Sequence, residues 1–225
     1  MKIAYILLLY ILFPLWGIAQ NDVTQFLGIP VNGTKLEMIN KLKSIGYTLI
    51  DYNEGKLEGE FNGTEVDLYV VTYKNKVYRI LIVDKNYVTD KLMIKRRFNN
   101  LMRQFQDNKS YIPLSDSEWT VSYITDNENI EYEILIRNKR YIATYYQNLK
   151  NRESYLKELT EILEKTMRNE ISRERAAKLE EEIHKKLYFS FYDRRVWFTI
   201  MPIEGTYKVL IYYDNVHNMP KGEDL

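Results

Sequence analysis

The stretch LEGEFNGTEVDLYVVTYKNKVYRILIVD, from Leu57 to Asp84, sets the plan of the chain. From Leu57 to Phe61, hydrophobic or small residues alternate with acids, which is the two-residue period of a strand with one solvated face. Asn62-Gly63 then supplies two residues that tolerate positive φ, as a tight hairpin turn requires. The stretch therefore begins as a β-hairpin.

Two further strands are expected after this turn. In the first of them, Val66, Leu68 and Val70 share one face, and polar residues occupy the other. The second, Val77 to Val83, is apolar on both faces apart from Tyr78-Arg79, so it should be the most covered of the three. The stretch is therefore predicted to form a β-meander.

The chain begins with the features of a secretory signal peptide, which we assign to residues 1–19. Met1-Lys2 precedes a short apolar run that ends at Trp16, and small residues precede a cleavage point after Ala19. The run is shorter than the ~20 apolar residues of a spanning helix, and Pro14 interrupts it. We expect an exported protein, periplasmic or secreted, with no membrane anchor after cleavage. An uncleaved anchor is the alternative.

The composition excludes several classes of protein. The sequence contains no cysteine, which removes disulfides, thiolate metal sites and cysteine nucleophiles together. The 32 Lys and Arg residues balance the 31 Asp and Glu residues. Because nucleic-acid-binding domains carry a basic stripe, we expect no nucleic-acid partner.

A helix followed by a meander is expected three times, at a spacing of roughly 60 to 70 residues. The predicted fold class is α+β, with antiparallel β-meanders and helices packed on one face. The predicted units are the signal peptide (1–19), two helix-plus-meander units (20–84 and 85–147), a long helix plus meander (148–215) and a polar tail (216–225).

Each unit should open with a helix. Thr34 to Ile45 begins with a capping box, in which Glu37 lies three residues after Thr34. Thr89 to Phe105 opens the second unit. Asn151 to Lys186 carries many acid-before-base pairs four residues apart, which are typical of a long helix with one wet side. Its apolar residues drift around the helix, so a long coiled coil is not expected, and a break near Asn169 to Ser172 is plausible.

The strands of the later units are predicted from the same alternation. They are Trp119 to Tyr123, Ile130 to Ile136, Arg140 to Tyr146, Leu187 to Phe191, Val196 to Ile203 and Tyr207 to Tyr213. The last strands of the first and third units are similar: KVYRILIVD at Lys76 to Asp84 and KVLIYYDN at Lys208 to Asn215. An internal duplication and an unrelated structural rhythm both remain open.

The segment FLGIPVNGTKLEMINKLKSIGY at Phe26 to Tyr47, with LEGEFNGTEV and VYRILIVD, resembles a pattern in exported, uncharacterised proteins of anaerobic gut bacteria. The layout of short helices on antiparallel meanders is also similar to the β-lactamase-inhibitor-protein-like fold. That second resemblance implies binding to other proteins or a part in envelope assembly.

Catalytic motifs are scarce in the sequence. Neither histidine, His184 or His217, has a second ligand three or four residues away, so we expect no metal site and no cofactor. There is no GxSxG, HExxH or Gly-rich phosphate loop. Acid pairs on strands leave glycoside processing as an alternative. These pairs are Glu58 and Glu60, Glu65 and Asp67, and Glu131 and Glu133.

Tyrosine is unusually frequent, with 20 residues against 8 phenylalanines. The candidate binding surface, on the face of the sheet without helices, comprises Tyr69, Tyr73, Tyr188, Tyr192, Glu58, Glu60 and Asp67. Such a surface suits stacking on sugars or anchoring a protein partner, although tyrosine also simply favours strands. We therefore expect a non-catalytic binding protein for an unknown protein or glycan partner. An envelope-assembly accessory and a glycan-processing enzyme are the alternatives.

Overall fold

The computed structural model describes residues 23–114, 123–148 and 152–220. The expected signal peptide at 1–19 lies outside the described residues, and so does most of the strand expected at Trp119 to Tyr123. None of the helices in the described part of the chain is both long enough and apolar enough to cross a membrane.

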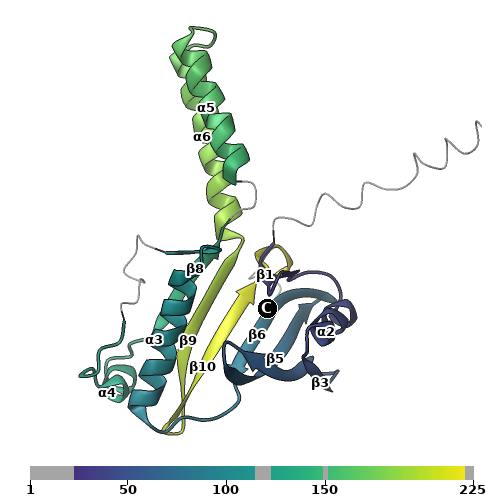
Figure 1. Cartoon of the computed structure of the whole chain (residues 1–225), viewed down its shortest axis with the longest axis vertical. Coiled ribbons are helices and arrows are strands. Elements are labelled where there is room, and N and C mark those ends of the chain that lie inside the picture. Colours follow the sequence, from purple (N-terminus) through teal and green to yellow (C-terminus); the bar gives the residue numbers. More distant parts are fainter. Residues whose placement is uncertain (1–22, 115–122, 149–151, 221–225) are drawn as a thin grey trace, which may run out of the picture.

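One antiparallel sheet of eight strands organises the molecule (Figure 1). Its strand order is β3-β4-β5-β6-β10-β9-β8-β7. The strands are β3 (Thr48–Asp51), β4 (Lys56–Phe61), β5 (Thr64–Tyr73), β6 (Lys76–Asp84), β7 (Tyr111–Pro113), β8 (Ile142–Gln147), β9 (Arg195–Ile203) and β10 (Thr206–Asp214). A separate two-stranded sheet near the N-terminal end pairs β1 (Gln25–Phe26) with β2 (Ile29–Pro30). The α+β class with antiparallel meanders is thus confirmed.

The meander from β4 to β6 forms as its sequence predicts. Asn62 and Gly63 adopt φ values of 51° and 74° in the first turn, and Asn75 adopts 60° in the second. Val66 and Leu68 on β5 are fully buried, whereas the neighbouring Asp67 and Tyr69 are only partly buried. The alternation therefore gives the sheet a core face and an open face.

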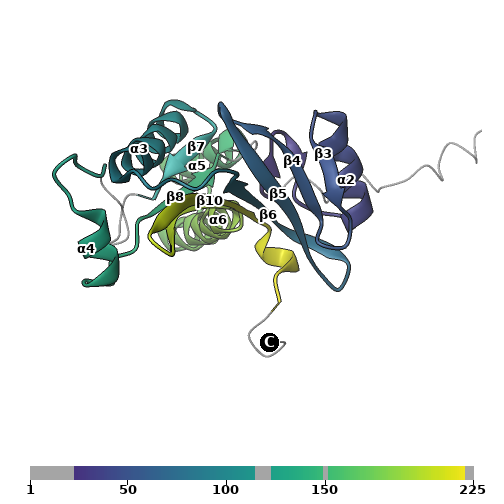
Figure 2. The same ribbon diagram turned by 90° about the horizontal axis from the view of Figure 1, so that it is seen from below.

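Two helices cover the core face, α2 (Lys35–Ser44) and α3 (Lys91–Asp107). The predicted capping box of α2 is present: the Glu37 N–H donates to Thr34 Oγ1, and the Thr34 N–H donates to Glu37 Oε2. The side chains of Leu42 on α2 and Phe98 on α3 are fully buried in one continuous core with the sheet. Figure 2 shows α3 on one side of the strands and the C-terminal segment leaving on the other.

Aromatic rings fill the core beneath each helix. On the β6 side, Phe26 packs edge-on against Tyr213 with ring centroids 5.1 Å apart. On the β9 side, Phe198 contacts Phe98 at 5.1 Å and Phe105 at 5.4 Å. Such pairs add about 0.5–1.5 kcal/mol each beyond the area they bury. Since the chain has no disulfides, these contacts between aromatic rings contribute to the stability of its core.

The predicted long helix is a helical hairpin of α5 (Arg152–Met167) and α6 (Arg173–Tyr192). The expected break is confirmed: Asn169 has a φ of 56°, and the Ser172 hydroxyl accepts a hydrogen bond from the Arg175 N–H. The strand expected at Leu187 to Phe191 was wrong, because Leu187 lies four residues after Ile183 and continues its helical stripe toward α5. The hairpin projects away from the sheet (Figure 1).

The strand expected at Ile130 to Ile136 was also wrong, since Ile130–Leu135 forms the short helix α4. The Asn129 side chain caps it by accepting from the Tyr132 N–H at 3.2 Å. Residues that alternate along a strand, such as Ile130, Tyr132 and Ile134, also include pairs four residues apart. Such pairs lie on one face of a helix, so the same pattern fits both structures. Here the cap and the complete burial of Ile130 favour the helix.

The predicted threefold repeat is not confirmed. The structure instead joins two four-stranded meanders, β3 to β6 and β7 to β10, through the antiparallel pairing of β6 with β10. The two similar sequences, Lys76 to Asp84 and Lys208 to Asn215, belong to these central strands, in which Val83 is opposite Leu210. The predicted tail begins as the 3-10 helix η1 (Val216–Asn218).

Candidate functional site

The predicted surface is assembled only in part. Glu58 and Glu60 on β4 and Asp67, Tyr69 and Tyr73 on β5 lie on the open face of neighbouring strands. Glu58 is directly opposite Asp67 in the register of these strands. These five residues therefore form an elongated patch along β4 and β5 near one edge of the sheet, with Glu60 and Tyr73 at its opposite ends.

Two of the three acids of this patch are paired with lysines. The Lys56 ammonium lies 3.2 Å from Asp67, and its hydrogen bond to that carboxylate raises the pKa of Lys56. Lys85 donates to Glu58 at 3.0 Å, which likewise raises the pKa of Lys85. Each of these two acids is thus balanced by its own base on an open sheet.

The third pair of acids lies on α4 instead of on a strand. Glu131 forms an ion pair with Lys91 at the start of α3, and Glu133 pairs with Arg137 at 3.4 Å. These two acids do not face a shared sheet surface, so the arrangement expected for this pair was wrong.

Tyr192 lies far from the patch. Its ring packs against Tyr146 on β8, with centroids 5.1 Å apart. Four strand spacings of ~4.8 Å separate β8 from β5, or roughly 19 Å. Tyr188 belongs to α6, and its side chain lies outside the described residues. The predicted grouping of Tyr192 with Tyr69 and Tyr73 was therefore wrong.

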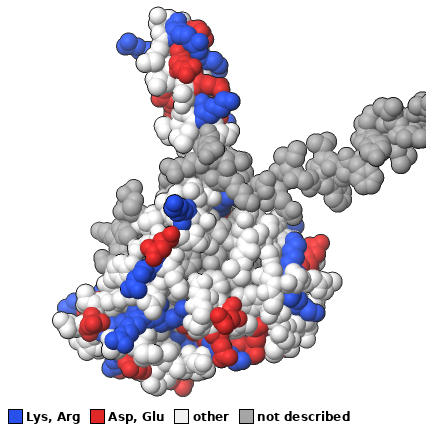
Figure 3. Space-filling view, in the orientation of Figure 1, with Lys and Arg blue, Asp and Glu red and all other residues white. Residues whose placement is uncertain are grey.

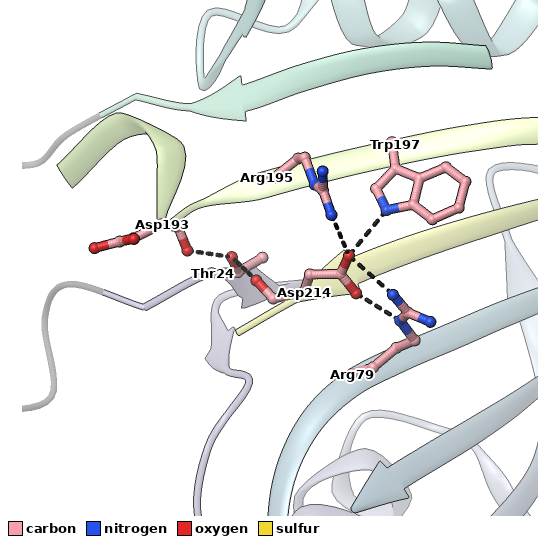
Figure 4. Close-up of polar contacts among 6 residues, drawn as sticks. All are labelled: Thr24, Arg79, Asp193, Arg195, Trp197 and Asp214. Atoms are coloured by element: carbon pink, nitrogen blue, oxygen red, sulfur yellow. Dashed lines mark hydrogen bonds and ion pairs between the residues drawn. The ribbon is translucent and has the colours of Figure 1, made fainter. Parts of the chain in front are cut away.

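The centre of the open face is a buried carboxylate that the sequence did not reveal (Figure 4). Asp214, at the end of β10, is 0% exposed. Arg79 on β6 binds it in a bidentate manner, with Nε 2.6 Å from Oδ1 and Nη2 3.1 Å from Oδ2. Trp197 Nε1 donates to Oδ2 at 2.9 Å, and Arg195 Nη2 lies 3.4 Å from the same oxygen. Two cations and an indole therefore converge on one anion.

The same residues build a stack of rings across three strands. The rings of Trp197 and Tyr212 stack with centroids 3.9 Å apart and planes 7° apart. The Arg79 guanidinium lies 4.8 Å from the Tyr212 centroid. Burial would lower the pKa of Arg79, but the hydrogen bond and charge of Asp214 outweigh it and raise the pKa. Asp214 thus fixes the orientation of both the cation and the indole.

Thr24, near the N-terminal end of the described residues, connects the backbone of Asp214 with the backbone of Asp193. The Thr24 hydroxyl lies within hydrogen-bonding distance of the Asp214 carbonyl oxygen and of the Asp193 carbonyl oxygen, 3.3 Å away (Figure 4). Asp193 immediately follows α6. The N-terminal segment, β10 and the root of the helical hairpin therefore meet beside the cluster.

A groove of about 350 Å³ lies along the open face next to the stacked rings. Trp197 and Tyr212 contribute to its lining, and Leu210 and Ile142 add apolar surface from β10 and β8. Its remaining lining residues are Ile134, Asn138, Lys139, Arg140, Thr199, Ile200, Met201 and Pro202. The groove is thus largely apolar, with cations contributed by the segment after α4.

Arg140 is the cation best placed to meet a ligand there. Its neighbour Lys139 is already paired with Glu128, to which Tyr141 also donates at 2.6 Å. Burial would raise the pKa of Glu128, but the hydrogen bonds from Lys139 and Tyr141 outweigh it and lower the pKa. Arg140 is exposed and makes no ion pair with any residue that the structure describes.

A larger hollow of about 520 Å³ lies between β1 and β7. Its polar groups are used within the protein only in part: Asn148 Oδ1 is buried without a hydrogen-bond partner in the described part of the chain, whereas Gln147 is fully engaged. The Gln147 side chain accepts from the Gln25 N–H at 2.7 Å and donates to the Gln25 carbonyl oxygen at 2.5 Å. It also donates to Tyr111 Oη at 3.3 Å. The groove beside Trp197 is the more apolar of the two hollows, and we take it as the candidate ligand site.

The sequence contained one usable signal for the missed cluster. Arg79 is a charge between Tyr78 and the apolar run from Ile80 to Val83, and Arg195, Trp197 and Tyr212 follow the two-residue period of the open face. The register, which places Arg79 opposite Asp214 and Trp197 opposite Tyr212, is long-range information that a single strand does not carry.

No family model, curated protein or solved structure matched the chain. In the described part of the chain, no three His, Cys, Asp or Glu side chains are grouped so as to hold a metal ion. His184 is exposed, and His217 lies 3.2 Å from the Asp193 carboxylate.

Proposed function

We propose that this chain is an exported, non-catalytic binding protein whose ligand lies in the groove beside Trp197 and Tyr212. One observation carries the proposal: a buried carboxylate, Asp214, fixes the orientation of Trp197, which lines an open and largely apolar groove. Binding sites are commonly concave and mostly apolar, with a few fixed polar groups, and have volumes of about 300–1,000 Å³.

The chemistry of the lining favours a ligand with an anionic group beside an apolar face. Arg140 supplies the cation, and Leu210, Ile142 and the rings supply the apolar contact. Acidic oligosaccharides combine a carboxylate with the C–H face of a sugar ring, and acidic peptides combine one with apolar side chains. Both classes share the chemistry that this groove would recognise.

The absence of catalysis is proposed on separate grounds. Glycoside hydrolysis needs two carboxyl groups on either side of the scissile bond, one of them held as an acid. Asp67 and Glu58 are each paired with a lysine, and neither lines the groove. Export is proposed from the signal-peptide pattern at residues 1–19, and fractionation of cells producing the full chain would test it.

The binding experiment uses residues 20–225 and two ligand panels, acidic oligosaccharides and acidic peptides. We expect calorimetry to detect binding to members of one panel, and Arg140→Glu to weaken it at least about tenfold, since a charge-assisted contact contributes about 1.5–3 kcal/mol. Lys76→Glu is the matched control, because Lys76 is an exposed cation at the start of β6 and does not line the groove.

Two results would contradict the proposal. One is that the Arg140→Glu and Lys76→Glu variants bind the ligand with equal affinity, which would place the ligand outside the groove. The other is conversion of a bound oligosaccharide into shorter products, which would restore the glycan-processing alternative.

A further inference from the structure

The helical hairpin of α5 and α6 has its own small core. Ile162 on α5 and Ala176 and Ile183 on α6 are buried against each other, apart from the core of the sheet. Figure 1 shows the hairpin projecting beyond the sheet. Most of its surface therefore does not pack against the rest of the chain.

Helix α5 carries two apolar seams, which explains why its apolar residues drift in the sequence. One seam, with Leu159 and Ile162, faces α6. The other consists of Leu156, Leu163 and Met167, which are 50%, 53% and 74% exposed. Spacings of seven and four residues place these three side chains on one face of the helix.

Charged residues of opposite sign border this exposed seam. Lys157 and Glu164 lie seven residues apart, which is about two helical turns, on the flank of the seam that faces away from α6. Both side chains are exposed. In Figure 3, basic and acidic side chains are interspersed along the visible side of the hairpin. Glu164 pairs with Arg168 at 3.5 Å, but both side chains are more than half exposed. Such a pair contributes only about 0–1 kcal/mol, so Glu164 can change partners at little cost.

We propose that the exposed seam of α5 binds the same seam of a second copy of this chain, with the two helices antiparallel. A twofold axis between Glu161 and Ile162 places Leu156 against Met167 of the second copy and Thr160 against Leu163 of the second copy. Lys157 then faces Glu164 of the second copy. By symmetry each of these contacts occurs twice.

Charge complementarity is what selects a second copy as the occupant. In an antiparallel helix pair, residues on one flank meet residues on the same flank of the partner, and charges there set the pairing. Lys157 and Glu164 lie on one flank and have opposite signs, so the antiparallel arrangement pairs them. In a parallel pair each flank meets the opposite flank of the partner helix, so Lys157 and Glu164 would not face each other.

The dimer should be weak. Three partly exposed side chains per copy bury much less than the ~1,600 Å² of a standard interface, and Thr160 is polar within the seam. We therefore expect a rapid equilibrium between monomer and dimer, with a dissociation constant in the micromolar range. The dimer is independent of the groove, so either proposal can fail without the other.

Sedimentation velocity of residues 20–225, from low micromolar to near-millimolar concentration, tests the dimer. We expect the sedimentation coefficient to rise with concentration. Lys157→Glu or Glu164→Lys alone should raise the dissociation constant at least tenfold, because each places like charges together twice. The double variant Lys157→Glu with Glu164→Lys should recover the dimer.

A mixture of the two single variants provides the sharpest readout. Each variant alone should associate at least tenfold more weakly than the parent chain, but the mixture should form a heterodimer, because each Glu then faces a Lys. Lys165→Glu is the control, since Lys165 is exposed on the opposite side of α5 and should leave the dimer unchanged. A chain that stays monomeric at every concentration would overturn the proposal. So would a dimer that the single variants leave intact or that the mixture fails to restore.

Discussion

Asp214 shows how a charge can be held inside this sheet. Its carboxylate is completely buried, and it is bound by a bidentate arginine and an indole N–H. A buried ion pair adds little net stability over an apolar pair, but removing one partner leaves the other charge uncompensated. The sequence could not locate this cluster, because it depends on the pairing of β6 with β10 across more than a hundred residues.

Asp214→Ala should lower the free energy of unfolding by about 3 kcal/mol, because Arg79 loses its partner while most of its side chain stays buried. For a domain of this size that corresponds to a fall in melting temperature of roughly 6–12 °C. Glu58→Ala, which removes an exposed ion pair, is the control and should cost less than about 1 kcal/mol. If thermal denaturation showed the same loss of stability for Asp214→Ala and Glu58→Ala, the buried Asp214 would contribute no more than an exposed ion pair.

At the scale of elements, the sequence predicted a helix or turn correctly where residues within that element determine its conformation. The capping box of Thr34 and Glu37 and the Asn62-Gly63 turn both formed as predicted. Local signals failed at α4, where one pattern fits a helix or a strand, and at the end of α6. There the choice depends on neighbouring elements, such as the contact between Lys91 and Glu131.

The hairpin should be removable without unfolding the sheet. β8 and β9 are paired up to Tyr146 and Arg195, so a short Gly-Ser linker replacing residues 150–191 can join them as a tight connection. We expect circular dichroism to show less helix and the melting temperature to change by only a few degrees. Loss of the cooperative transition would mean that the hairpin is part of the main folding unit.

At the scale of the whole molecule, part of the abundant tyrosine belongs to the core: six of the tyrosines that the structure describes are buried. Tyr47, Tyr141, Tyr145 and Tyr213 are all nearly inaccessible to solvent. Burial raises the pKa of Tyr47 to about 12 and also raises the pKa of the other three. The high tyrosine content was therefore a real feature of the chain. The structure places only some of these residues on the open face and buries others in the core.

These tyrosines predict a steep alkaline transition. Their pKa values are raised in the folded state, so their contribution is complete below pH ~10 and is lost as the pH rises toward the folded-state values. Each tyrosine that ionises only on unfolding lowers the free energy of unfolding by about 1.4 kcal/mol per pH unit. Tyrosinate absorbance should therefore rise in two phases, the second coinciding with loss of circular dichroism.

Tyr47→Phe should make this second phase less steep, whereas Tyr87→Phe should not, because Tyr87 is 58% exposed. A single smooth titration of all tyrosines near pH ~10, with the fold still intact, would contradict the assignment of these rings to the core.

Fluorescence of Trp197 tests the proposed groove most directly. In residues 20–225, Trp119→Phe leaves Trp197 as the remaining tryptophan. We predict that an acidic oligosaccharide or peptide identified by calorimetry changes its emission in a saturable way, that Arg140→Glu abolishes the change, and that Lys76→Glu preserves it. A ligand that binds with full affinity and leaves the emission of Trp197 unaltered would contradict the account.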